Sequence, residues 1–98
     1  MKATLVIRER VVFDDAAILE IKVWRVPTPV VPSRHLLKYS LFYGRPGNRL
    51  VGYDNERGKG DHRHYESREE TYEFSSIEKL LADFKLDVEA LRLSLIHI

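Results

Sequence analysis

The chain has 98 residues, which is enough for one domain with a small core. Its 44% hydrophobic and 32% charged residues are typical of a globular protein and exclude a disordered or low-complexity chain. The net charge of +1 excludes an overall basic field that would attract nucleic acid. Because cysteine is absent, disulfides and thiolate metal sites are excluded, and a cytoplasmic location is favoured. No apolar run approaches the roughly 20 residues that span a bilayer, and we expect neither a signal peptide nor membrane binding.

Extended patterns fill the first part of the chain. Residues 3–13 contain apolar positions suited to a strand, and Asp14–Asp15 predicts a turn after it. Residues 16–26 alternate between apolar and polar positions, which predicts a half-buried antiparallel strand. Residues 27–33 read PTPVVPS, and their prolines predict a stiff loop because proline fixes φ and cannot donate to a sheet.

A hairpin is predicted next. Residues 35–43 form a further strand pattern, and the turn sequence GRPGN at 44–48 joins it to a second pattern at 49–55. The residues TYEF at 71–74 predict one more short strand.

One helix is predicted after these strands. Ser75–Ser76–Ile77–Glu78 has the spacing of a capping box, so the helix should begin there and end near Arg92. Apolar residues then recur at helical spacing, and they predict one buried face: Ile77, Leu80, Leu81, Phe84, Val88 and Leu91. The order of elements predicts an α+β domain over residues 1–92, with a curved, mostly antiparallel sheet of about five strands and the C-terminal helix packed on one face.

The last six residues, LSLIHI, break the helical pattern. They match the translation of a common sequencing-library transposase adapter. We therefore expect residues 93–98 to be an assembly artefact and the native sequence to be truncated near Arg92. A genuine apolar C-terminus, forming a last strand or helix turn, is the alternative. His97 is left out of the functional analysis for this reason.

The stretch GYDNERGKGDHRHY at residues 52–65 concentrates the chemically active side chains. In an extended backbone, His62 and His64 would point to one side, with Asp61, Arg63 and Tyr65 on the other. Three interpretations are open: a metal site, a catalytic site for RNA, and a solvated connecting loop without chemistry.

A metal site would use the two histidines, with a carboxylate oxygen from Asp54 or Asp61. The next histidine towards the N-terminus, His35, is far away in sequence. A divalent ion would be repelled by three cationic neighbours, Arg57, Lys59 and Arg63. We therefore expect no metal and no other cofactor.

Acid–base cleavage of RNA needs a base for the 2′-OH, an acid for the leaving oxygen and cations for the phosphate. The two histidines suit the proton transfers, because the ordinary histidine pKa is near neutral pH. Lys59 and Arg63 would stabilise phosphate charge, Asp61 would orient a histidine, and Tyr65 would stack on a base or donate a hydrogen bond. Further candidates for substrate binding are Arg57, Tyr53, Arg68 and Asp54, the last also as an alternative carboxylate.

The same stretch, preceded by YSLFYGRPGNRLV and by ILEIKVWRVP, resembles the TumE family of bacterial and archaeal toxin–antitoxin proteins. The resemblance covers roughly Met1 to Phe84. It implies a small toxin encoded beside an antitoxin that is typically a helix-turn-helix protein, and many toxins of this size cleave RNA. The leading hypothesis is a metal-independent ribonuclease toxin using His62 and His64. The alternative is a non-catalytic module that binds RNA or a protein through the basic loop 56–68.

Overall fold

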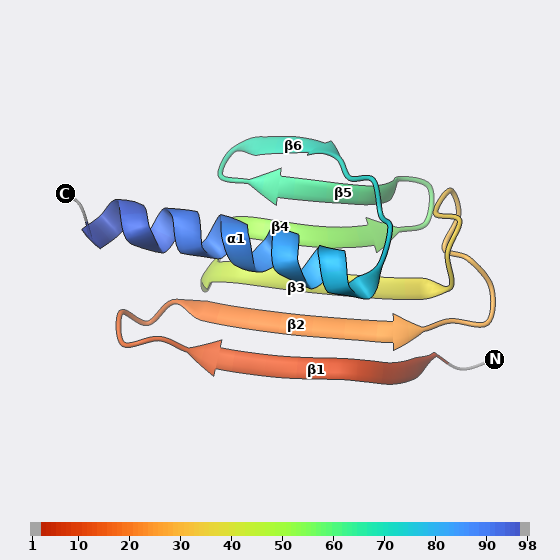
Figure 1. The fold of residues 1–98 in the computed structure, drawn as a ribbon, viewed down its shortest axis with the longest axis horizontal. Helices are drawn as coiled ribbons and strands as arrows, with labels where there is room; N and C mark the ends of the chain where they lie inside the picture. Colours follow the sequence, from red (N-terminus) through yellow and green to blue (C-terminus); the bar gives the residue numbers. More distant parts are fainter. Residues whose placement is uncertain (1–2, 97–98) are drawn as a thin grey trace.

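The computed structural model describes residues 3–96, and in this part of the chain six antiparallel strands form one sheet in the order β1-β2-β3-β4-β5-β6. One helix, α1, lies across one face of the sheet (Figure 1). The α+β class and the antiparallel sheet are confirmed, with six strands in place of about five. Nothing helical within these residues is both long and apolar enough to cross a membrane. The elements are β1 Thr4–Val12, β2 Ile18–Arg25, β3 Leu37–Arg45, β4 Asn48–Glu56, β5 Gly60–Tyr65, β6 Arg68–Thr71 and α1 Ile77–Ile96.

The additional strand comes from the second half of the charged stretch. The connecting turn is limited to residues 57–59, and β5 begins directly after it. A second tight turn follows, in which Glu66 adopts φ 55° and its N–H donates to the carbonyl of Leu50 at 2.7 Å. β6 therefore ends at Thr71, and the strand predicted at 71–74 is wrong except for its first residue. The charged stretch at residues 52–65, for which a connecting loop is one interpretation of the sequence, therefore lies mostly in β4 and β5.

Alternation along the strands determines which face of the sheet α1 covers. The odd-numbered residues in the middle of β2 (19–23) and of β3 (39–43) are buried on the face that α1 covers, while their even-numbered neighbours lie on the uncovered face. Leu80, Phe84 and Val88 of α1 complete this core and expose 0%, 0% and 4% of their surface. Burying a side chain of this size stabilises the fold by about 1.5–3 kcal/mol. The predicted apolar stripe is confirmed, with its other members packed around the core.

The start of α1 differs from the predicted capping box by one residue. Ser76 is the N-cap, because its Oγ accepts from the N–H of Lys79 at 3.1 Å and its carbonyl accepts from the N–H of Leu80 at 3.0 Å. Glu78 therefore stands at the second helical position, where it complements the helix dipole without reaching back to the cap.

The helix continues to Ile96, past the end predicted near Arg92. Arg92 holds this region against the sheet, since its Nη1 donates to the Tyr43 hydroxyl at 2.8 Å. Its guanidinium also lies 3.8 Å from the centre of the Phe13 ring. His97 lies outside the described residues, and the expected artefact at 93–98 stays a prediction.

Candidate functional site

The two histidines of β5 lie on the face of the sheet that α1 leaves uncovered. His62 pairs across the sheet with Asp54, and His64 pairs with Gly52 on β4 and with Glu69 on β6. Directly paired residues share a face, so these side chains come together from three adjacent strands. The extended backbone that would aim both histidines in one direction is confirmed by β5.

We call Asp54, His62, His64 and Glu69 the histidine cluster. The Nε2 atom of His62 lies 3.2 Å from Asp54 Oδ1 and 4.0 Å from Glu69 Oε2. The Nε2 atom of His64 lies 3.4 Å from Glu69 Oε2 and 4.0 Å from Asp54 Oδ1. The two imidazole rings are 5.6 Å apart between centroids and almost perpendicular. Two nitrogen and two oxygen atoms therefore converge on one small volume.

Arg49 completes the surroundings of this cluster. Its side chain crosses β4 above Gly52, where an added Cβ would lie 2.7 Å from Arg49 Cδ. The guanidinium Nη2 reaches His64 Nδ1 at 2.9 Å. Arginine can only donate, so Nδ1 accepts and the proton of neutral His64 is on Nε2. Burial and the charge of Arg49 together lower the pKa of His64 below its ordinary value.

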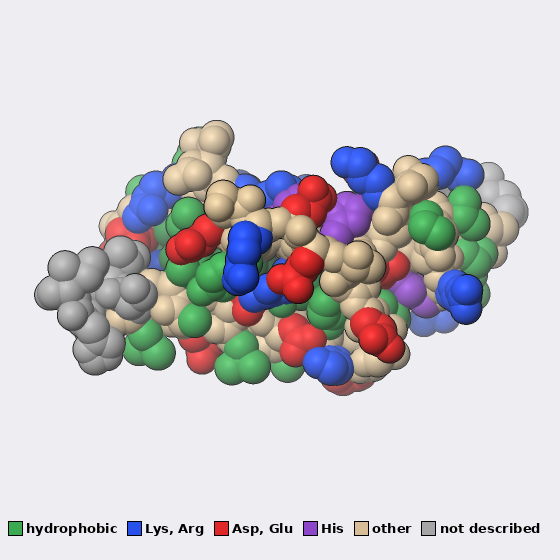
Figure 2. Space-filling model, turned by 90° about the horizontal axis from the view of Figure 1, so that it is seen from above, with side chains coloured by type: hydrophobic (Ala, Val, Ile, Leu, Met, Phe, Trp, Pro, Cys, Tyr) green, Lys and Arg blue, Asp and Glu red, His purple; other side chains and the backbone are tan. Residues whose placement is uncertain are grey.

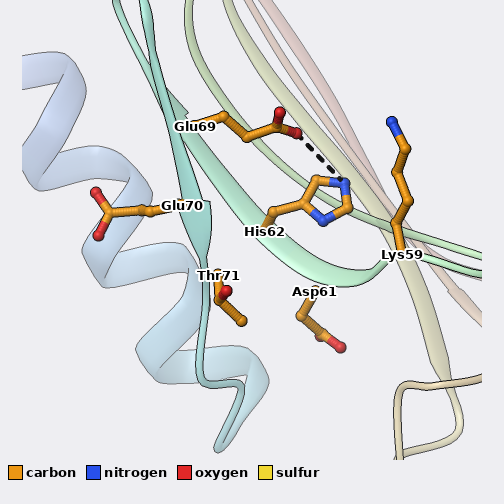
Figure 3. A pocket seen from close by; sticks show the side chains of 6 residues that line it. All are labelled: Lys59, Asp61, His62, Glu69, Glu70 and Thr71. Atoms are coloured by element: carbon orange, nitrogen blue, oxygen red, sulfur yellow. Dashed lines mark ion pairs between the residues drawn. The ribbon is translucent and has the colours of Figure 1, made fainter.

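An open pocket of about 320 Å³ lies beside His62. Figure 3 shows Glu69 reaching towards the His62 imidazole from β6, while the Lys59 side chain stands on the other side of that ring. The carboxyl group of Asp61 points away from the imidazole in the same view, and Glu70 points towards α1. Three acidic residues therefore line the pocket with the imidazole and the ammonium group, and of these Glu69 is the one that points towards the imidazole.

Asp61 belongs to a different group on the opposite face of β5. Its Oδ2 is 2.7 Å from His35 Nε2 and accepts from the Tyr39 hydroxyl at 2.7 Å. Its Oδ1 accepts from the hydroxyl of Ser33. The Leu37 N–H donates to His35 Nδ1 at 3.2 Å, so both nitrogens of that ring are engaged. Among the described contacts Asp61 reaches neither His62 nor His64, so no contact supports the role predicted for it as their orienting residue.

The Asp61 group anchors the proline-rich loop. Ser33 and His35 sit at the end of this loop, and both bond to β5 through the one carboxylate. The N–H of Gly58 donates to the carbonyl of Val31 at 2.8 Å, which adds a second attachment. Figure 2 shows histidine side chains at two separate places on this side of the molecule. His35 is therefore close to the charged stretch in space but lies apart from the His62–His64 pair.

Arg63 also lies on the covered face and binds the helix. Its Nε donates to Asp87 Oδ2 at 2.8 Å and to the Tyr53 hydroxyl at 3.0 Å, and its Nη2 donates to Asp87 Oδ1 at 3.0 Å. The hydrogen bond to Asp87 raises the pKa of Arg63, and burial together with Asp87 raises the pKa of Tyr53. The predicted phosphate contact of Arg63 stays a prediction, and it would require the guanidinium to leave Asp87 of α1.

The remaining predicted residues are spread around the site. Tyr53 is buried, so its ring is not available to stack on a base. Tyr65 lies under two guanidinium groups, with Arg63 at 4.9 Å and Arg68 at 6.0 Å from the ring centre. Arg57 lies exposed in the β4–β5 turn. Asp54, predicted as an alternative carboxylate, is beside His62.

Two residues of the site were not predicted. Arg49 was assigned only to a strand, and Glu69 was not considered because β6 was expected later in the chain. The pairing of β5 with β6 sets Glu69 opposite His64, whereas Arg49 reaches His64 because its side chain passes over Gly52, the β4 residue that pairs with His64. A correct register for β5 and β6 would have identified Glu69, but alternation along β4 would not have identified Arg49, because the register of β3 and β4 shifts beside it.

The cluster also has the composition of a metal site. Asp54, His62 and His64 each offer one ligand atom, and these atoms all lie within 4.8 Å of one another. One reason for expecting no metal was the charge of Arg63, and that side chain is on the opposite face of the sheet.

The comparisons with known proteins identify one family. The family model described as Toxin TumE matches residues 2–92, which is nearly the whole chain. No curated protein and no solved structure matches the chain. The resemblance noted from the charged stretch is thereby confirmed.

Proposed function

The chain belongs to the TumE toxin family, which makes it the toxin component of a toxin–antitoxin system, and on this basis we propose that it is a metal-independent ribonuclease. The observation that carries the proposal is the pair of imidazoles 5.6 Å apart, with a guanidinium 2.9 Å from one of them. These three side chains would supply a base, an acid and a phosphate-binding cation from one patch on the uncovered face.

The cleavage would proceed through attack of the ribose 2′-OH on the neighbouring phosphorus. A base removes the 2′-OH proton, the oxygen forms the new P–O bond, and an acid protonates the 5′ oxygen as its bond to phosphorus breaks. We assign the base to His64, because the cation of Arg49 beside it disfavours a second positive charge. We assign the acid to His62, the other imidazole of the pair, whose Nε2 lies 3.2 Å from Asp54 Oδ1.

Arg49 and Lys59 would bind the phosphate. The guanidinium of Arg49 now donates to a neutral imidazole. A hydrogen bond from the same guanidinium to a phosphate oxygen would be stronger, because donor and acceptor would then both be charged. Transfer of Arg49 from His64 to the phosphate would free Nδ1 of His64 when RNA binds. Lys59 stands at the edge of the same pocket. Asp61, Arg63 and Tyr53 would support catalysis only by holding β5 in place.

The antitoxin partner and the cellular location are proposed from the membership of the toxin family. A toxin of this kind is paired with a cognate antitoxin, and we propose a helix-turn-helix antitoxin encoded beside it, with both proteins acting in the cytoplasm of a prokaryote. A neighbouring helix-turn-helix gene across related loci supports this pairing, and its repeated absence contradicts it.

The test of the catalytic proposal is expression without an antitoxin. We expect wild type to arrest growth, and His62→Gln and His64→Gln each to relieve the arrest by at least tenfold in surviving cells, with the circular dichroism of the purified protein unchanged. The control is Arg8→Gln, an exposed residue of β1 on the same face, which should stay fully toxic.

Purified protein separates catalysis from binding. Wild type should cleave RNA in the presence of EDTA, and the two histidine variants should bind RNA but not cleave it. Full toxicity in both folded histidine variants would sink the acid–base proposal and favour a non-catalytic module that uses the basic stretch 56–68. Loss of cleavage with EDTA alone would contradict metal independence.

A further inference from the structure

We infer that the histidine cluster is also a binding site for a divalent cation of the zinc type. Occupancy would block the two imidazoles, so the toxin would be inhibited by the metal that it binds. The inhibition rests on the proposed ribonuclease function, whereas the binding rests on the geometry of the cluster alone.

The spacing of the cluster matches tetrahedral zinc. A zinc ion about 2.0–2.1 Å from its nitrogen and oxygen ligands has those ligands about 3.3 Å apart, as the edges of a tetrahedron. Here Nε2 of His62 is 3.2 Å from Asp54 Oδ1, and Nε2 of His64 is 3.4 Å from Glu69 Oε2. Nε2 of His62 is 4.0 Å from Glu69 Oε2, and Nε2 of His64 is 4.0 Å from Asp54 Oδ1. Two of the four distances are thus close to a tetrahedral edge, and the other atoms would have to move closer for one metal to bind all four ligands.

One carboxylate oxygen of Asp54 is an acceptor that a cation would pair with. Its Oδ1 is buried, and no donor within the described part of the chain is hydrogen-bonded to it, although His62 Nε2 lies 3.2 Å away. A buried acceptor without a donor costs about 1–3 kcal/mol, so such an atom usually has an ion, a water or a functional role. A cation between Oδ1 and the imidazoles satisfies it.

The ligands differ in how firmly they are held. His62 and His64 are on the central part of β5, with side chains only 8% and 12% exposed, so their positions are set by the sheet. Glu69 is 52% exposed on the edge strand and can move as the fourth ligand. The two carboxylates offset the charge of the ion, while soft sulfur ligands are absent. Zinc suits this nitrogen and oxygen set better than magnesium, which prefers six oxygen ligands.

Arg49 opposes the metal in one specific way. A histidine that binds a metal through Nε2 carries its proton on Nδ1, and that nitrogen now accepts from Arg49. Metal binding therefore requires the guanidinium to turn away. A residue at position 49 that accepts a hydrogen bond from Nδ1 of His64 would favour metal binding. Substitution of Arg49 therefore tests whether His64 binds the metal through Nε2.

The experiment is calorimetric titration of the metal-free full-length protein with ZnCl₂, with MgCl₂ as the comparison ion. We expect one zinc per chain and no magnesium binding at the same concentrations. His62→Gln, His64→Gln and Asp54→Asn should each weaken zinc binding at least tenfold, while Arg49→Gln should strengthen it several-fold. Circular dichroism confirms that each variant is folded, and Arg8→Gln serves as the unaffected control.

Equal zinc affinity in wild type and in all three ligand variants overturns the site, as does the absence of any zinc binding. RNA cleavage with and without zinc then tests the consequence, and inhibition at one zinc per chain is expected. Stimulation by zinc would leave the site in place, overturn the inhibition and contradict the metal-independent mechanism. If no RNA is cleaved under any condition, the proposed function fails while the titration still decides the cation site.

Discussion

Arg63 and His62 are neighbours in the chain, but they have different contacts because β5 turns them to opposite faces. His62 joins the cluster on the uncovered face, whereas Arg63 forms three hydrogen bonds with Asp87 and Tyr53 below α1. The pleat of β5 thus divides a run of charged residues in the sequence between the uncovered face and the face that packs against α1. The chemistry of the site has to be assigned residue by residue along β5.

Arg63→Ala tests this division. Asp87, whose side chain is only 16% exposed, would lose its cationic partner, so the free energy of unfolding should fall by about 2–4 kcal/mol in urea denaturation. Arg68→Ala is the control: this exposed side chain lies at the edge of the sheet, and its removal should change stability by less than about 0.5 kcal/mol. A loss of cleavage without any loss of stability in Arg63→Ala would support the catalytic role first predicted for it.

Asp83 gives a pH dependence at the same scale. Burial alone would raise the pKa of Asp83, but hydrogen bonds from Tyr72 and Lys79 outweigh it, and the pKa lies below its ordinary value of 3.8. A carboxyl group with a lowered pKa stabilises the fold above its unfolded pKa, and this stabilisation is lost as pH falls through the folded pKa. Asp83→Asn should therefore reduce stability by about 1 kcal/mol at pH 6 to 7.

The difference between Asp83→Asn and wild type should shrink as the pH is lowered below 3.8 and should vanish once the carboxyl group of the folded protein is protonated. Urea denaturation at a series of pH values measures it. A difference that stays constant down to the lowest pH at which the protein folds would show that the charge of Asp83 is not the cause.

At the scale of elements, the two hairpins β4–β5 and β5–β6 build the site. Gly58 and Gly60 adopt φ values of 88° and 79°, which only glycine tolerates well, and they close the β4–β5 turn within residues 57–59. This short turn sets the register that pairs Asp54 with His62. The helix contributes no residue to the histidine cluster; it supports the sheet from the other face.

The start of α1 gives a prediction at this scale. Ser76→Ala removes the hydroxyl that accepts from the N–H of Lys79, and the free energy of unfolding should fall by about 1 kcal/mol. Ser75→Ala should have almost no effect, although the capping-box spacing in the sequence pointed to that serine. Urea denaturation of both variants decides between them, and a larger loss in Ser75→Ala would move the cap back by one residue.

For the whole molecule, the sheet separates stability from chemistry by face. The core lies between the sheet and α1, and the histidine cluster lies on the other face of the sheet, with the two histidines largely buried and Glu69 half exposed. Substitutions in the two places should therefore abolish toxicity by different routes.

Phe84→Ala compared with His64→Gln tests this separation. Truncation of Phe84, which is fully buried, should cost about 3–5 kcal/mol, a large part of the stability of a small domain, and should lower Tm together with toxicity. His64→Gln should abolish toxicity with Tm changed by only a few degrees. An equal drop in Tm for both variants would show that His64 is part of the folding core.

The sequence by itself determined the class of the fold, the apolar face of the helix, most of the strands and the family. These features depend on local periodicity and on a contiguous motif, which a reader of the chain can recognise. It also selected His62 and His64, because their spacing in a strand places them on one face. The contribution of Asp54 was left open as one of two carboxylates.

Only the tertiary structure decided which other residues join them. Arg49 and Glu69 come from neighbouring strands, and Asp61 is taken up by His35 from a loop 26 residues away. Such partners depend on register, and a shift of one residue would exchange the two faces of every strand. The local sequence specifies which residues of a strand share a face, whereas the pairing between strands specifies which residues of neighbouring strands lie side by side.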